Sequence, residues 1–219
     1  ITAVAVQKIC DEIFMDAGQE GVMNLVLADV QPVGQRMLED ERLPLISATG
    51  SCAMGRIVGQ VVARRMGRSL LELGGNNAII VWEDADLDLA VRAVLFGAAG
   101  TAGQRCTTTR RLFLHKAIEK EFTTRLLRGY KQIKVGNPLE AGNLMGPLID
   151  RGAVDRMMAA LDRAKDGGAE IVFGGHRLEG DAYPGGCYVE PTIVKARAEM
   201  PIVAEETFAP ILYLLPATD

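Results

Sequence analysis

The amino-acid sequence predicts an α/β fold, built of parallel βαβ units in two successive domains. Short apolar runs of strand type alternate with stretches of helical periodicity along the whole chain, as in parallel sheets with crossover helices. With 219 residues, 48% of them hydrophobic, the chain can bury a substantial core. The Gly74-Gly75 pair separates two apolar runs, so we expect domains at residues 1–73 and 74–219.

The first domain is expected to contain three strands and three helices. Residues 2–17 predict a helix, because Val4, Ile9 and Ile13 recur near helical spacing and Gly18 follows as a stop. The remaining segments, in order, are a strand at 22–27, a helix at 35–40, a strand at 43–48, a helix from 50 to about 66 and a strand at 69–73.

The second domain is expected to continue this alternation. Asp86 is placed to cap a helix over residues 87–99, and a loop of small residues at 101–109 leads into a strand at 111–115. The other predicted segments are a strand at 77–82, helices at 118–133 and about 150–166, and strands at 170–173, 188–194 and 211–215.

The composition argues against several classes of function. A net charge of −4, with acids and bases interspersed, lacks the basic patch that nucleic acids and anionic membranes require. The longest apolar stretches are too short to span a bilayer and no export signal is visible, so we expect a cytoplasmic protein. Its four cysteines lie dozens of residues apart beside only two histidines, so no disulfide framework and no metal site are expected.

A turn at residues 49–55 follows a predicted strand and opens a helix. Free backbone N–H groups and the helix dipole at such a turn suit a phosphate group. The glycine spacing, from Gly50 to Gly55, differs from the dinucleotide-binding fingerprint, and Ser51 fits plain helix capping as well.

A single carboxylate, Glu72, stands between Leu71 and Leu73 at the end of an apolar strand. Desolvation at this position favours proton uptake, which is the property that a general base needs. The two glycines that follow allow a backbone or a ligand to approach closely. A strand-end glutamate that points into solvent is the alternative.

Cys106 lies in a loop of small and polar residues at 100–109. The Arg105 cation and the backbone donors of such a loop favour the thiolate, which is the reactive form of cysteine. The same N–H groups can receive an oxyanion. These residues alone fit a nucleophile and an unreactive thiol equally well.

Adjacent carboxylates at Glu205 and Glu206 are followed by an aromatic ring at Phe208 and by Pro210. A glutamate can accept hydrogen bonds from both hydroxyls of a ribose, and a nearby ring can flank a nicotinamide. A charged turn leading into a strand explains the same residues.

Taken together and in this order, the four segments resemble the aldehyde dehydrogenase family, and the similarity runs over essentially the whole chain. Further matching stretches are Val135-Gly136-Asn137-Pro138, Gly146-Pro147 and Glu190-Pro191-Thr192. Residues 71–80 and 100–111 look most like the antiquitin-like branch. That branch oxidises α-aminoadipic semialdehyde, which equilibrates with Δ1-piperideine-6-carboxylate, in lysine catabolism.

The resemblance implies a Rossmann-like cofactor half-domain at residues 1–73 and an α/β catalytic domain, incomplete at its C-terminus, at 74–219. It makes Cys106 the nucleophile and Glu72 the general base. It implies NAD as the cofactor, with NADP not excluded. The residues that it assigns to the cofactor are Gly50, Ser51, Leu73, Glu206 and Phe208.

The resemblance also implies an internal fragment of a longer enzyme, an expectation that agrees with the start at Ile1 rather than Met. The family's oxyanion-hole asparagine and its pocket-closing segment are expected outside this chain. The whole protein is expected to be a homodimer or homotetramer that acts on a small aldehyde, with no nucleic-acid or membrane partner.

Arg105, which directly precedes Cys106, is the candidate for substrate recognition. Its guanidinium can bind the distant carboxylate of an amino-acid semialdehyde through two parallel hydrogen bonds. A loop arginine that bonds only to backbone groups is the alternative.

Two other classes of function fit parts of the sequence. A cysteine-based acyl transferase or hydrolase needs a base beside Cys106, and His115 and His176 are the only imidazoles. An inactive fragment or nucleotide-binding module would retain the fold without turnover. Formation of reduced cofactor from an aldehyde separates the dehydrogenase from both.

Overall fold

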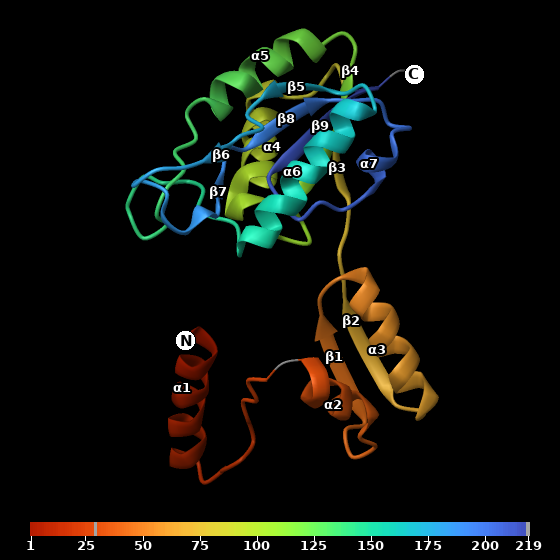
Figure 1. Ribbon diagram of the computed structural model, residues 1–219, viewed down its shortest axis with the longest axis vertical. Coiled ribbons are helices and arrows are strands. Elements are labelled where there is room, and N and C mark those ends of the chain that lie inside the picture. The colour runs from red at the N-terminus through yellow and green to blue at the C-terminus, as the bar shows by residue number, and fades with distance from the viewer. Residues whose placement is uncertain (29, 218–219) are drawn as a thin grey trace. The chain divides into compact units, whose positions relative to one another are not determined.

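The computed structural model describes residues 1–28 and 30–217 (Figure 1). The chain divides into two compact units, Ile1–Leu73 and Gly74–Asp219. The fold class is α/β, as predicted, and each unit is described below by itself.

The first unit contains a two-stranded parallel sheet with one helix packed along it (Figure 1). Strand β1 (Leu45–Thr49) pairs with β2 (Arg68–Glu72), and α3 (Cys52–Arg64) connects them. Val58 and Val62 on the inner face of α3 are buried. This is the βαβ unit that the alternating pattern predicts, with each boundary shifted by a residue or two.

Two more α-helices of the first unit are α1 (Thr2–Asp16) and α2 (Gln35–Glu39), both close to their predicted positions. The strand predicted at residues 22–27 is wrong, because those residues form neither a helix nor a strand. An isolated apolar run becomes a strand only when a neighbouring strand accepts its backbone hydrogen bonds, and none does so here within the described residues.

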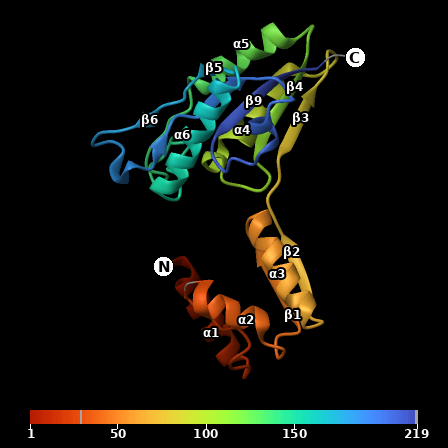
Figure 2. The ribbon, with the colours of Figure 1, turned by 45° about the vertical axis from the view of Figure 1, so that its right-hand side comes forward.

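The second unit is a five-stranded sheet in the order β3-β4-β9-β8-β5, covered by helices on both faces (Figure 2). The four strands from β3 to β8 are parallel neighbours, while β5 runs antiparallel to β8 at the edge. These strands are β3 (Asn77–Val81), β4 (Thr109–His115), β5 (Glu170–Phe173), β8 (Thr192–Lys195) and β9 (Ile211–Ala217). The main helices are α4 (Leu87–Ala99), α5 (Glu119–Tyr130) and α6 (Arg151–Asp166).

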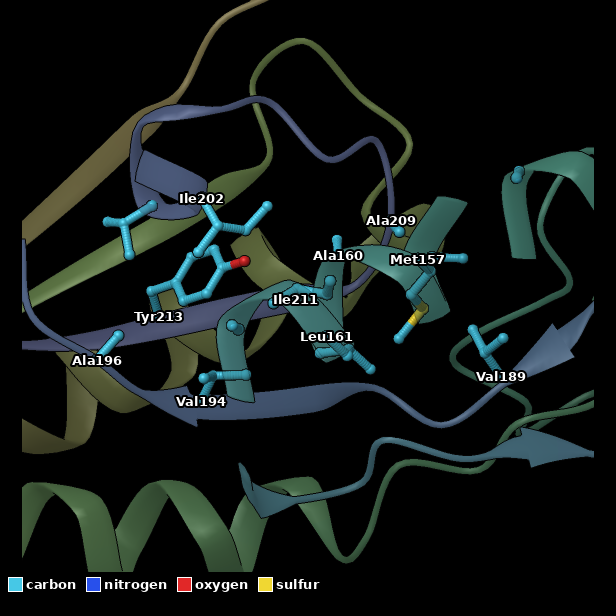
Figure 3. Packing of buried hydrophobic residues seen from close by; sticks show 14 of the residues in the cluster. Met157, Ala160, Leu161, Val189, Val194, Ala196, Ile202, Ala209, Ile211 and Tyr213 are labelled. Carbon is cyan, nitrogen blue, oxygen red and sulfur yellow. The ribbon is translucent and has the colours of Figure 1, made fainter. Parts of the chain in front are cut away.

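Strand β9 is buried on both faces, which explains its continuous apolar sequence. Ile211 and Tyr213 pack with Met157 and Leu161 of α6 (Figure 3). The intervening residues of β9 belong to a second cluster, which contains residues of α4 and α5. The central strands of this unit are therefore held rigidly between two hydrophobic layers.

The strand predicted at residues 188–194 is interrupted. It consists of β7 (Tyr188–Val189) and β8, which lie in different sheets. Pro191 stands between them and cannot donate to a strand ladder, which accounts for the break. Two further short elements, β6 (Arg177–Leu178) and α7 (Pro201–Ala204), are too brief to leave a periodic signal in the sequence.

None of the helices in the described part of the chain combines the length and apolar character that a bilayer span requires. Within the same residues, no group of three or more histidine, cysteine, aspartate or glutamate side chains could hold a metal ion.

Candidate active site

The amino ends of β3, β4 and β9 lie at one edge of the second unit's sheet, because these strands are parallel neighbours. Three segments that are distant in sequence lead into those ends. They are the Gly74-Gly75 pair before β3, the cysteine loop (residues 100–108) before β4 and the acidic segment (residues 205–210) before β9. The sheet thereby gathers Cys106, Glu206 and Phe208 at the same edge.

The cysteine loop begins with three consecutive residues in left-handed backbone conformation, Thr101, Ala102 and Gly103, with φ values of 52°, 53° and 69°. Two of these are not glycine, so the turn stores backbone strain of the kind found at functional sites. A Cβ atom at Gly103 would collide with the main chain of Ala209. The cysteine loop and the acidic segment are therefore in direct backbone contact.

Side chains from other segments hold the cysteine loop in place. Asn77 Nδ2 donates to the carbonyl oxygens of Cys106 at 2.5 Å and of Thr108 at 3.0 Å. Gln104 Oε1 accepts from the main-chain N–H of Ile149 at 2.8 Å, which ties the loop to the segment before α6. The Cys106 side chain itself is exposed, as a nucleophile that must meet a substrate requires.

Arg105 lies against helix α4. Its guanidinium stands 5.0 Å from the centre of the Phe96 ring, and Nη2 makes a long hydrogen bond of 3.4 Å to the Phe96 carbonyl. Its Nε is buried and has no hydrogen-bond partner among the described residues. The backbone contact that the sequence left open as an alternative is thus present.

Arg110 is a functional candidate that sequence reasoning missed. Its side chain is 2% exposed, yet it carries a charge. Nη1 donates to the Thr108 carbonyl at 3.3 Å, while Nη2 donates to the Arg105 carbonyl at 3.2 Å and to Glu206 Oε1 at 3.1 Å. Burial lowers the pKa of Arg110, and the neighbouring Glu206 carboxylate opposes that shift. In the sequence it is one of two adjacent arginines, Arg110 and Arg111, that precede the apolar residues of β4, which gives only a weak signal.

The Glu206 carboxylate is held by two groups. Oε1 accepts from Arg110 and also from the main-chain N–H of Gly75 at 3.1 Å. Any Cβ atom at Gly74 would collide with this carboxylate. Glu206 therefore occupies the space that a side chain at Gly74 would take, which explains the first glycine of the pair noted in the sequence.

A cavity of about 310 Å³ opens beside the acidic segment, between α6 and α7. Arg156, Glu206 and Phe208 are among the residues that line it. The Phe208 ring is 46% exposed, and its inner side faces the Arg110 guanidinium at 5.3 Å. The cavity thus combines a carboxylate, a cation and an accessible aromatic ring.

The candidate residues of the first unit are also close to one another. The main-chain N–H of Gly50 donates to the carbonyl of Glu72 at 3.0 Å, so the glycine turn adjoins the end of β2. Ser51 Oγ accepts from the Met54 N–H at 3.1 Å and caps α3. Leu73 packs so closely on α3 that a Cβ at Gly55 would collide with it.

The expected desolvation of Glu72 is wrong for this unit. Glu72 is exposed, because β2 belongs to a sheet that has two strands, with a helix along it, in the part of the chain that the structure describes. The alternative that the sequence left open, a strand-end glutamate pointing into solvent, describes its surroundings here.

His115 does not serve Cys106 as a base. Cys106 precedes the amino end of β4, whereas His115 is the last residue of that strand, where its ring centre lies 4.7 Å from that of Trp82. A strand of this length rises about 3.3 Å per residue, so the two side chains lie at opposite edges of the sheet. The acyl-transferase hypothesis thereby loses one of its two imidazoles.

The fold and site define an α/β protein with an exposed cysteine beside an arginine–carboxylate pair and an aromatic ring. Its family is shown by the profile described as "Aldehyde dehydrogenase family", which matches residues 1–219. The chain belongs to the aldehyde dehydrogenase family.

Two individual relatives show which members of the family this chain is similar to. The chain is 48% identical over 220 residues to "Alpha-aminoadipic semialdehyde dehydrogenase" of Mus musculus, and all of the chain aligns with 40% of that protein. It is 45% identical over 219 residues to "Aldehyde dehydrogenase family 7 member A1" of Pisum sativum, again over all of the chain and 42% of the relative. The chain therefore spans about two fifths of the length of these relatives.

Solved structures agree with this assignment. Betaine aldehyde dehydrogenase from Staphylococcus aureus in complex with NAD⁺ matches with a TM-score of 0.90 and 33% sequence identity. The match covers 95% of this chain and 42% of that protein. The predicted membership of the family and its α/β fold are both confirmed.

Proposed function

We propose that the protein containing this chain oxidises an aldehyde to the carboxylic acid with NAD⁺, and that Cys106 is its nucleophile. The observation that carries the proposal is the packing of the cysteine loop on the acidic segment. Through this contact an exposed thiol shares one sheet edge with Glu206 and Phe208. Membership of the aldehyde dehydrogenase family supports the same conclusion.

The chemistry assigned to Cys106 begins with addition of its thiolate to the aldehyde carbon. The product is a thiohemiacetal, whose oxygen carries the negative charge and needs hydrogen-bond donors. Loss of a hydride from the same carbon leaves an acyl thioester on Cys106. Family resemblance alone assigns the next step to Glu72, which as general base would take a proton from water; the resulting hydroxide attacks the thioester carbon, and the thiolate leaves as the carboxylic acid is released.

The residues present fit a nicotinamide dinucleotide. The cavity beside Glu206 offers a carboxylate for ribose hydroxyls and the exposed Phe208 ring for a flat heterocycle. In the first unit, the turn at Gly50 and Ser51 opens α3, where helix N–H groups suit a phosphate, and Leu73 is assigned a cofactor contact by family resemblance. When bound, the nicotinamide supplies the hydride acceptor. NADP remains an alternative cofactor.

We further propose an amino-acid semialdehyde, such as α-aminoadipic semialdehyde, as the substrate. The mouse relative bears the name of that activity. Arg105 is the residue that we propose for the substrate carboxylate, because it directly precedes Cys106, is only partly buried and carries a guanidinium that can bind a carboxylate. We also propose a cytoplasmic homodimer or homotetramer for the whole protein.

The test is an assay of the full-length protein with NAD⁺ and with NADP⁺, against α-aminoadipic semialdehyde and against a simple aliphatic aldehyde. We expect NADH to form fastest with the semialdehyde, and the Cys106→Ser variant to form none above background. Nucleotide binding without any NADH formation would instead favour a non-catalytic nucleotide-binding protein. Undiminished turnover by Cys106→Ser would overturn the assignment of the nucleophile.

A further inference from the structure

Arg110 is the most deeply buried charge at the candidate active site. Its side chain is 2% exposed, and burying a charge at that depth is costly unless hydrogen bonds compensate for the lost water. Two of its nitrogens make three hydrogen bonds, and Nε has no partner among the described residues. The bonds that Arg110 does make therefore indicate what it is there to hold.

Those three bonds go to two different parts of the site. Nη1 and Nη2 bind the carbonyl oxygens of Thr108 and Arg105, which lie on either side of Cys106 in the cysteine loop. Nη2 also binds Glu206 Oε1. A planar guanidinium presents its donors in a fixed fork, so the positions of these three acceptors are coupled to one another.

The face of the guanidinium adds a further contact. It lies 5.3 Å from the centre of the Phe208 ring, and Phe208 also lines the cavity. Lysine can supply the charge at this position but neither the fork nor the flat stacking surface. The geometry thus depends on arginine in particular and not only on a cation.

We propose that Arg110 is a positioning residue, which sets the orientation of Cys106 and of the Glu206–Phe208 pair as one unit. The roles of the thiol and of the pair rest on the proposed function. The positioning itself rests only on the three hydrogen bonds and the ring contact. Because Glu206 reaches the cysteine loop through Arg110, a change at Glu206 is transmitted to the Cys106 thiol.

The experiment measures the rate at which iodoacetamide alkylates Cys106 in the full-length protein without cofactor, followed by mass spectrometry of the Cys106 peptide. Arg110→Lys is expected to change this rate by about tenfold, the effect of losing one charge-assisted hydrogen bond. In the dehydrogenase assay the same variant is expected to raise KM for NAD⁺ and lower kcat together. Arg177→Lys, which alters an exposed ion pair with Asp155, is the matched control and should change neither.

A second variant covers the case in which Arg110→Lys folds poorly. Glu206→Gln keeps an oxygen acceptor for Gly75 but weakens the bond to Arg110. We expect it to change the alkylation rate of Cys106, and to do so non-additively with Arg110→Lys. A lowered unfolding temperature in both variants with an unchanged Cys106 alkylation rate would overturn the proposal. Failure of the wild-type protein to form NADH would refute the proposed function alone, since alkylation needs no turnover.

Discussion

The side-chain amide of Asn77 donates to the main-chain carbonyl of Cys106 at 2.5 Å, across a separation of 29 residues. Asn77 begins β3, with Asn76 between it and the glycine pair, and its amide also donates to the Thr108 carbonyl. Asn77, from before the cysteine loop, and Arg110, from after it, thereby both bind carbonyl groups of that loop. This amide therefore holds the main chain at the residue that carries the thiol.

Asn77→Ala is expected to lower kcat by about tenfold in the full-length protein, because two carbonyl groups lose their donor and the cysteine loop loses its orientation. Steady-state kinetics with an aldehyde and NAD⁺ will measure the loss. Asn143→Ala is the matched control, since Asn143 makes a similar amide bond of 2.9 Å to the Asn137 carbonyl in another loop. Equal kcat in the Asn77 variant and in the control would contradict this prediction.

Arg105→Ala is expected to lower kcat/KM for a carboxylate-bearing semialdehyde by about tenfold or more, and to spare a plain aliphatic aldehyde. The reason is that only the first substrate has a carboxylate for the guanidinium to bind. Arg105→Lys keeps the charge but loses the fork, so its kcat/KM for the semialdehyde should lie between those of the wild type and Arg105→Ala. If Arg105→Ala leaves the ratio of the two kcat/KM values unchanged, Arg105 does not recognise the carboxylate.

Gly103→Ala is expected to lower the free energy of unfolding by more than the cost of placing alanine in a left-handed backbone conformation. Gly142 also has a positive φ, of 91°, but an added Cβ there meets open space, whereas at Gly103 it meets the Ala209 main chain. We therefore expect about 1–2 kcal/mol for Gly142→Ala, from backbone strain, and a further loss for Gly103→Ala from the clash. Urea unfolding of both variants measures the difference, and equal losses would argue against the close contact.

The ion pair between Arg163 and Glu205 is expected to make stability depend on pH. Its hydrogen bond from Arg163 holds the pKa of Glu205 below the usual 4.5. A carboxyl whose pKa is lowered by folding stabilises the protein above its unfolded pKa and loses that contribution as the pH falls through the folded one. The unfolding temperature of the wild type should thus exceed that of Arg163→Met, by a difference that becomes smaller below about pH 4.5 and in high salt. A difference in unfolding temperature that stays constant as the pH falls would contradict the role of this ion pair.

Local hydrogen bonding explains the elements that the sequence predicts well. The helix α4 has the predicted bounds, because Asp86 accepts from the N–H groups of Asp88 and Leu89 within a few residues of itself. Asp150 caps α6 in the same way. Such contacts need nothing outside the segment, so they can be read along the chain.

The sequence by itself determined the family, the α/β alternation and the proposed roles of Cys106, Glu206 and Phe208, because these depend on the identity and order of residues. Only the tertiary structure decided that residues 22–27 form no strand, that Glu72 is exposed and that Arg110 is buried. Each of these depends on which segment packs against which. Arg110 meets Glu206 across 96 positions because β4 and β9 are adjacent strands, and no local pattern encodes that adjacency.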